Sequence, residues 1–226
     1  MTRQDLEQND SQVSSSSEGE DDIPAGVEKL QEFCCAAAKC GFRWAWTDTC
    51  CINKQDYAEA SESLNTMFKW YRCSALTIVY LHDVDDDIKD CGGRRKRPSW
   101  VDRGWTLQEM LAAKSLRFYS KEWTLLEETA RLIDHRKKNF WSRALSRTTG
   151  VPGDDLVNFK TGTDQVRLRL RWAARRTTTK VEDMAYCLLG IFDVSLPVMY
   201  GEGPRAFVRL QEELMKRTGD LSLFDW

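Results

Sequence analysis

The chain has 226 residues and a mass of 26.2 kDa, a length that fits one large domain and excludes a long multidomain assembly. Hydrophobic residues make up 42% and charged residues 30%, a balance typical of a soluble globular protein and too polar for a membrane protein. The 33 Lys and Arg residues nearly balance the 35 Asp and Glu residues. No global basic field therefore favours nucleic acid or an anionic membrane as a partner.

The first 24 residues are predicted to form a disordered tail. They contain seven acidic side chains, one arginine, a run of serines and no aromatic residue, so they bury too little surface to offset the entropy of ordering. The segment has no apolar core of a secretory signal. The longest apolar run, at 75–81, is too short to span a membrane. We expect a cytoplasmic protein.

The eight cysteines are expected to be reduced and to act mainly as small buried hydrophobic residues. Their spacing includes two adjacent pairs but no C-x-x-C, and the chain has only two histidines, so no zinc site is predicted. The cysteines are Cys34, Cys35, Cys40, Cys50, Cys51, Cys73, Cys91 and Cys187.

The residues from 27 to 120 alternate between helical and strand patterns. Apolar residues recur at helical spacing before Gly41, whereas WAWTDTCCI and LTIVYL are dense in β-favouring residues. In chain order we expect a helix at 27–38, a buried strand at 44–52, a helix at 60–71, a strand at 76–81, a helix opening near Trp105 and a strand at 115–120. This alternation predicts an α/β fold with a parallel sheet flanked by helices.

Beyond Lys121 the pattern predicts a helical C-terminal subdomain. A loop is expected at 148–155, and helices at 165–176, 181–192 and 205–217, with a turn before the last of them. The arginines of 167–176 are interpreted as a charged helix surface because no platform of stacking aromatic residues accompanies them. Nucleic acid is therefore not expected as a partner.

Two polar side chains follow predicted strands at the edge where open parallel sheets bind ligands. Asp48 lies at the end of the first predicted strand, and His82 directly follows the second. Both are candidates for a ligand cleft. For Asp48, a role in capping a helix or forming a turn is an equally good interpretation.

Trp105 and Glu109 are separated by four residues, so on a helix they share one face. A carboxylate beside an indole is partly desolvated, which raises its pKa. The alternative is that Trp105 belongs to the core and that Glu109 is a solvated residue paired with Arg103.

Several long motifs in a fixed order resemble those of the fungal heterokaryon incompatibility (HET) domain family. They are TDTCCINKQD, SLNTMFKWYRCSALTIVYLHDV, SWVDRGWTLQEMLAAKSLRFYSKEW, RTTTKVEDMAYCLLGIFDVSLPVMYGEGPRAFVRLQEEL and LSLFDW. The resemblance implies a domain at 25–226, divided into an α/β part at 25–120 and a mainly helical part at 121–226. It also implies a cytosolic module of fungal innate immunity that triggers programmed cell death in non-self recognition.

HET domains are similar to the Toll/interleukin-receptor (TIR) fold, some members of which cleave NAD. The strand LTIVYL followed by the W-x-x-x-E helix is similar to the TIR arrangement, in which the glutamate is catalytic. This resemblance implies a TIR-like NAD hydrolase with Glu109 as the catalytic residue and Trp105, Arg103, Asp48 and His82 near the substrate. NAD would be the substrate, and no cofactor or metal is expected.

The resemblance also implies that the first strand of the TIR-like sheet is missing, because the acidic tail stands in its place. The alternative function is therefore a non-catalytic interaction module that forms homo-oligomers or binds signalling partners, or an inactive truncated HET domain. Loss of toxicity on replacement of Glu109 would distinguish the enzyme from the module.

Overall fold

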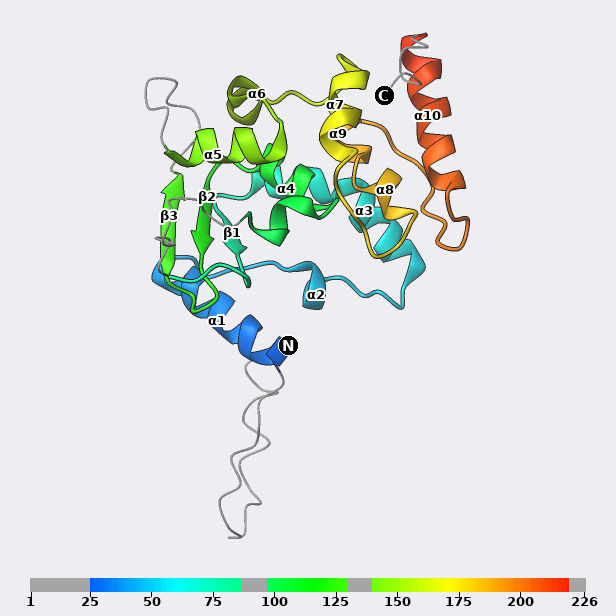
Figure 1. Cartoon of the computed structure of the whole chain (residues 1–226). Helices are drawn as coiled ribbons and strands as arrows, with labels where there is room; N and C mark the ends of the chain where they lie inside the picture. Colours follow the sequence, from blue (N-terminus) through cyan, green and yellow to red (C-terminus); the bar gives the residue numbers. More distant parts are fainter. Residues whose placement is uncertain (1–24, 87–96, 130–139, 220–226) are drawn as a thin grey trace, which may run out of the picture.

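The computed structural model describes residues 25–86, 97–129 and 140–219 (Figure 1). Within these ranges the chain forms a small sheet with helices around it, followed by a helical C-terminal part that contains α7 to α10. The predicted acidic tail lies outside the described residues. The α/β class and the helical second half are confirmed.

The sheet has three strands in the order β1-β2-β3, namely Thr77–Tyr80, Leu116–Tyr119 and Leu125–Thr129. β1 and β2 are parallel, with Thr77 opposite Leu116, and the sequence predicts both. β3 pairs with β2 in the antiparallel direction, so the sheet is mixed. The prediction misses β3 because its sequence, LLEET, is rich in helix formers; the turn at 120–124 returns the chain onto β2 instead.

The strand predicted at 44–52 is wrong. Thr47 is extended, but Asp48–Cys51 forms the short helix α2, and the segment pairs with no strand of the described sheet. None of these nine residues is buried, and the Trp44 side chain is 92% exposed. Aromatic and β-branched residues favour a strand only where a neighbouring strand and a core receive them.

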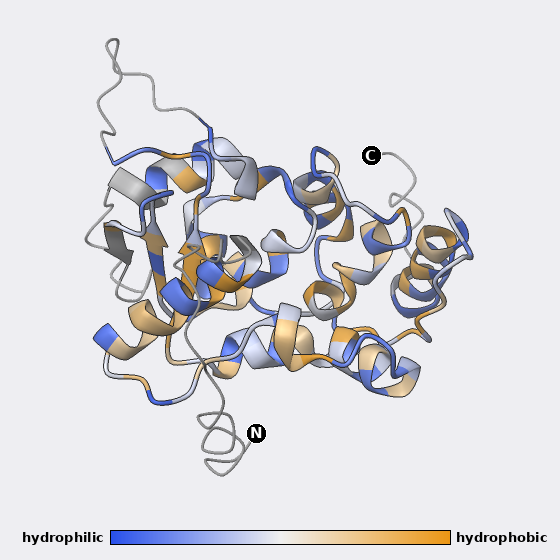
Figure 2. Cartoon of the chain, turned by 90° about the horizontal axis from the view of Figure 1, so that it is seen from below, coloured by the Kyte–Doolittle hydropathy of each residue, from blue (hydrophilic) through white to orange (hydrophobic). Residues whose placement is uncertain are grey.

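The helices agree in part with the prediction. The predicted helix at 181–192 forms as two short helices, and helices occupy parts of the loop predicted at 148–155. Apolar residues on one side of α10, such as Leu210 and Leu214, are buried, and Figure 2 shows this helix in both hydrophobic and hydrophilic colours. Besides α2, the helices are α1 Ala25–Lys39, α3 Tyr57–Cys73, η2 Ser99–Asp102, α4 Thr106–Ala112, α5 Phe140–Thr149, α6 Gly153–Asn158, α7 Val166–Ala173, α8 Asp183–Tyr186, α9 Leu189–Phe192 and α10 Arg205–Thr218.

Helix α4 lies at the centre of the molecule, where it packs against α3, α6, α9 and η2 (Figure 1). Six of its seven residues are buried, and Glu109 is the one that is not. The hydrophobic core therefore fixes α4 from several sides. The single partly exposed position on this rigid helix carries a carboxylate.

The turn at 197–204 joins α8 to α10 through buried polar contacts. Glu202 accepts a hydrogen bond from the Tyr186 hydroxyl at 2.7 Å and pairs with Arg209 at 2.6 Å. Glu182 accepts from the backbone N–H groups of Gly201 and Gly203. The turn thus docks the last helix, as its sequence indicated.

The predicted charged surface at 167–176 needs correction, because Arg169 and Arg176 are buried. The Arg169 guanidinium donates to the carbonyl oxygens of Lys160, Gly162 and Ile191 and lies 4.9 Å from the centre of the Phe159 ring. By donating to these three carbonyl groups, the planar guanidinium holds the loop before α7 in place. This arginine is a structural residue of the core.

The cysteines also differ from the prediction. Of the seven in the described residues, only Cys187 is buried, and Cys34, Cys35, Cys50, Cys51 and Cys73 are exposed; Cys91 lies outside the described residues. The described residues contain no cluster of three or more His, Cys, Asp or Glu side chains able to hold a metal ion. None of the described helices is long and apolar enough to cross a membrane.

Candidate functional site

A large cavity of about 1150 Å³ opens beside the edge of β1. Its walls come from α1, the segment around α2, α3, β1 and the start of α4. Four of the five predicted site residues line it: Asp48, Arg103, Trp105 and Glu109. The cavity therefore brings together side chains from segments about 60 residues apart.

Glu109 projects from α4 into a desolvated environment. Burial raises the pKa of its carboxyl group to about 7, and the nearby charge of Asp48 acts in the same direction, while Arg103, Arg176 and a hydrogen bond from Trp100 oppose the rise. A carboxyl group with a pKa near neutrality exchanges protons easily at physiological pH. The pKa of Glu109 is raised, whereas the pKa values of Asp83, Asp86 and Glu182 are lowered.

Trp105 and Glu109 lie on the same face at the start of α4, as predicted. Trp105 precedes the first residue of α4, and its carbonyl oxygen accepts the Glu109 N–H at 3.4 Å. Both side chains line the cavity. Asp48 faces the same cavity from the first turn of α2, not from the end of a strand.

Sequence reasoning misses two side chains that lie close to Glu109. Burial, followed by the charge of Glu109, raises the pKa of Tyr71 from α3 far above its ordinary value. Trp100 from η2 is the second neighbour, and it acts to lower the pKa of Glu109. The helical spacing of apolar residues in α3 includes Tyr71, and no sequence signal distinguishes a core tyrosine from one that reaches a carboxylate.

The loop that carries Arg103 is held by a segment more than 70 residues later. The Thr177 N–H donates to the Asp102 carbonyl at 2.7 Å, and the Gly104 N–H donates to the Thr177 carbonyl at 2.9 Å. The buried Arg176 guanidinium donates to the Arg103 carbonyl and to the Thr106 hydroxyl, each at 2.9 Å. The residues 176–177 therefore act as positioning residues for the start of α4.

Replacing Arg176 with methionine is expected to lower the free energy of unfolding by about 2 kcal/mol, because buried hydrogen-bond acceptors would lose their donor. Urea denaturation followed by circular dichroism measures this loss. Arg175→Met is the matched control, since Arg175 is exposed and its loss should change stability by less than about 0.5 kcal/mol. Equal midpoints for the two variants would contradict the positioning role.

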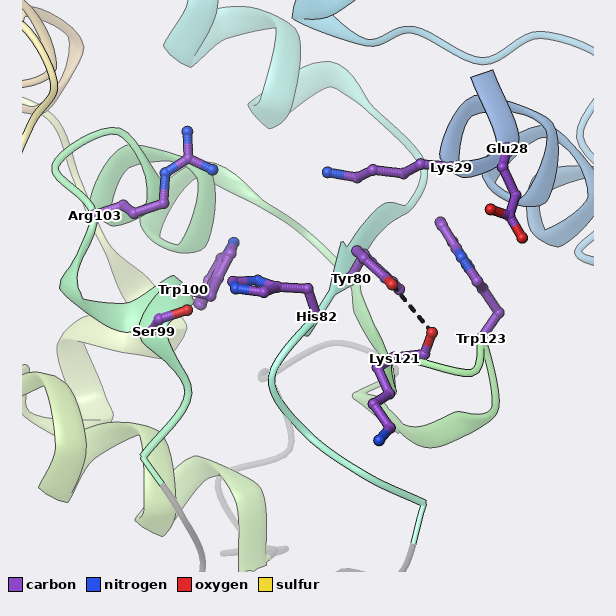
Figure 3. A pocket seen from close by; sticks show the side chains of 9 residues that line it. All are labelled: Glu28, Lys29, Tyr80, His82, Ser99, Trp100, Arg103, Lys121 and Trp123. Atoms are coloured by element: carbon purple, nitrogen blue, oxygen red, sulfur yellow. Dashed lines mark hydrogen bonds between the residues drawn. The ribbon is translucent and has the colours of Figure 1, made fainter. Parts of the chain in front are cut away.

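His82, the fifth predicted residue, lies in a second pocket of about 420 Å³ (Figure 3). Lys29, Tyr80, Trp100, Arg103 and Trp123 line both this pocket and the larger cavity. His82 therefore lies in a space that adjoins the Glu109 site. Together the two spaces offer a carboxylate, cationic side chains and several aromatic rings, a set of groups suited to a nucleotide with a sugar and phosphates.

Comparison with known proteins identifies two family models along the chain. The model for heterokaryon incompatibility protein (HET) matches residues 3–98, and a domain of unknown function, DUF8212, matches residues 205–226. The first match begins within the predicted acidic tail. No solved structure matches the chain significantly.

A curated relative covers nearly all of the chain. The vegetative incompatibility protein HET-E-1 of Podospora anserina is 40% identical over 205 residues, which amount to 87% of this chain. The matched region is only 14% of that protein. The relative therefore contains a great deal of sequence that this chain does not match.

Proposed function

Because the chain belongs to the fungal heterokaryon incompatibility (HET) family, we propose that it acts in heterokaryon incompatibility by hydrolysing NAD or a related nucleotide. In this role it triggers programmed cell death on non-self recognition. The observation that carries the enzymatic part is the partly buried Glu109, whose carboxyl pKa is raised to about 7 inside a cavity lined by aromatic and cationic side chains.

The proposed reaction breaks the bond between nicotinamide and ribose and adds water to the sugar. Its transition state resembles an oxocarbenium ion, so a nearby carboxylate stabilises the developing positive charge and orients the ribose hydroxyl groups. Nicotinamide is a good leaving group and needs no strong general acid. Tyr71, Trp100 and Arg103 are close enough to Glu109 to interact with its carboxyl group.

The direct test is incubation of the purified chain with NAD, followed by chromatographic measurement of nicotinamide. We expect nicotinamide and ADP-ribose to form in equal amounts. A chain that is folded by circular dichroism, yet releases no nicotinamide above the spontaneous rate, would overturn the enzymatic proposal.

The pH dependence gives a further prediction. Because the ionised Glu109 stabilises the transition state, activity should rise as the pH passes through about 7. Asp48→Asn removes a charge that raises the pKa of Glu109, so the midpoint of the rise should move to lower pH by about half a unit. Asp154→Asn, an exposed change on α6, serves as the control. A midpoint that is the same in both variants would contradict the coupling.

A second candidate function is a non-catalytic module that assembles through its surface. The observation that favours it is the group of exposed aromatic side chains at the rim of the cavity, where Trp44 is 92% and Tyr57 60% exposed. In this case Glu109→Ala would leave toxicity in fungal cells unchanged, and the purified chain would elute well above 26.2 kDa.

A further inference from the structure

The smaller pocket, of about 420 Å³, is formed by α1, the end of β1, η2 and the turn between β2 and β3. Lys29 comes from α1, Tyr80 and His82 from the end of β1, and Trp100 and Arg103 from η2 and the residue after it. Figure 3 shows Lys29 and Arg103 reaching toward one another from opposite sides, with His82 and Trp100 between them. The pocket thus concentrates positive charge at its mouth.

These two cations have no carboxylate partner in the described part of the chain. Neither Lys29 nor Arg103 forms an ion pair within 4.0 Å there, whereas Lys121 is paired with Asp85 and Glu122. The Glu28 carboxylate lies beside Trp123, across the pocket from Arg103 (Figure 3). The Lys29 ammonium lies 5.4 Å from the centre of the Tyr80 ring. Two converging cations without a carboxylate within 4.0 Å favour an anionic ligand, and a guanidinium with an ammonium suits phosphate oxygens.

One wall of the pocket is an aromatic surface with a strained backbone. The rings of Tyr80 and Trp123 stack with their centres 4.5 Å apart and an angle of 16°. Trp123 has a φ of 58°, in the left-handed region that bulky residues rarely adopt. Backbone strain of this kind persists where the surrounding structure enforces it and is common at ligand sites. Because Lys29 and Trp123 both lie against the Tyr80 ring, a flat base would lie against Trp123.

We propose that this pocket binds the diphosphate of a nucleotide between Lys29 and Arg103, with the adjoining nucleoside against Trp123. The inference rests on the proposed function and deepens it. Because Arg103 and Trp100 line both spaces, the ADP half of NAD occupies this pocket while the nicotinamide end extends into the larger cavity toward Glu109. The pocket thereby selects for dinucleotides over nicotinamide riboside.

The test is calorimetric titration of the full chain with ADP, adenosine and inorganic pyrophosphate. ADP should bind at least about tenfold more tightly than adenosine, because only ADP presents the diphosphate to both cations. Lys29→Gln should weaken ADP binding about fivefold and leave adenosine binding unchanged. Lys39→Gln removes the same charge from an exposed position at the other end of α1 and should leave ADP binding within about twofold of the original.

Pyrophosphate binding that also depends on Lys29 would support the anion site. The proposal is overturned if ADP does not bind, if adenosine binds as tightly as ADP, or if Lys29→Gln and Lys39→Gln have equal effects. These outcomes are distinct from failure of the enzymatic proposal. Nicotinamide release without ADP binding would refute the pocket alone, and ADP binding without nicotinamide release would refute the hydrolase alone.

Discussion

Replacing Glu109 with glutamine is expected to lower the rate of nicotinamide release from NAD by about a thousandfold. The change keeps the size and shape of the side chain but removes the charge that stabilises the oxocarbenium-like state. Release is measured at several NAD concentrations. The loss should lie in kcat, because an interaction made mainly in the transition state has little effect on binding of the substrate.

The same variant should be more stable than the original protein at alkaline pH. The pKa of Glu109 is about 7 in the folded chain and near 4.5 in the unfolded chain, so between these values the folded state holds a proton that the unfolded state has lost. The free energy of unfolding therefore falls as the pH rises from 4.5 through 7. Glutamine removes this fall, and at a pH of about 8 the variant should be more stable by about 1–3 kcal/mol.

A stability gain combined with loss of activity separates chemistry from unfolding. Glu212→Gln, at an exposed position on α10, controls for the loss of one carboxylate and should retain full activity. If Glu109→Gln released nicotinamide as fast as this control, the catalytic assignment would be wrong.

Replacing Gly190 with alanine is expected to lower the free energy of unfolding by about 3 kcal/mol or more. Gly190 lies in α9 against α3, and a Cβ atom there would be 2.2 Å from the Phe68 Cβ and 2.8 Å from its Cγ. The Phe68 Cβ is fixed to the backbone, so no rotamer change relieves the overlap. The two helices must separate, and the buried Phe68 would lose contact with the core.

Urea denaturation compares this variant with Gly153→Ala. Gly153 is the first residue of α6, and a Cβ there would meet nothing within 4 Å. Alanine restricts the unfolded chain and favours the helix, so this control should be unchanged or more stable by up to about 1 kcal/mol. Equal stability of the two variants would show that α3 and α9 can separate at little cost.

The elements that sequence predicts correctly are those whose periodicity and burial agree. The helices α3 and α10 have apolar residues at helical spacing, and some of these are buried: Met67 and Phe68 in α3, and Ala206, Leu210 and Leu214 in α10. The segment at 44–52 and strand β3 differ from the prediction for the opposite reason, because pairing with a neighbour decides their conformation. The sequence of one segment does not specify which other segment of the chain will pair with it.

In the candidate site, too, the sequence predicts the local geometry but not the contacts between distant residues. The spacing of Trp105 and Glu109 is enough to place them on one face, because the geometry of a helix is local. The contacts of Glu109 with Tyr71 and Trp100, and the contact of Arg103 with Arg176, join residues far apart in sequence. Tertiary packing creates these contacts, so the spacing of residues along the chain does not predict them.

The contact between Arg103 and Thr177 also affects the order in which the molecule folds. Contacts that close long loops carry a large entropic cost and form late. Synthesis begins at the N-terminus, so Arg103 and Glu109 leave the ribosome well before the segment that positions them. A nascent chain that ends before Thr177 contains the acidic residue of the site without the support of its loop. Assembly of the site is therefore delayed until Thr177 has been made.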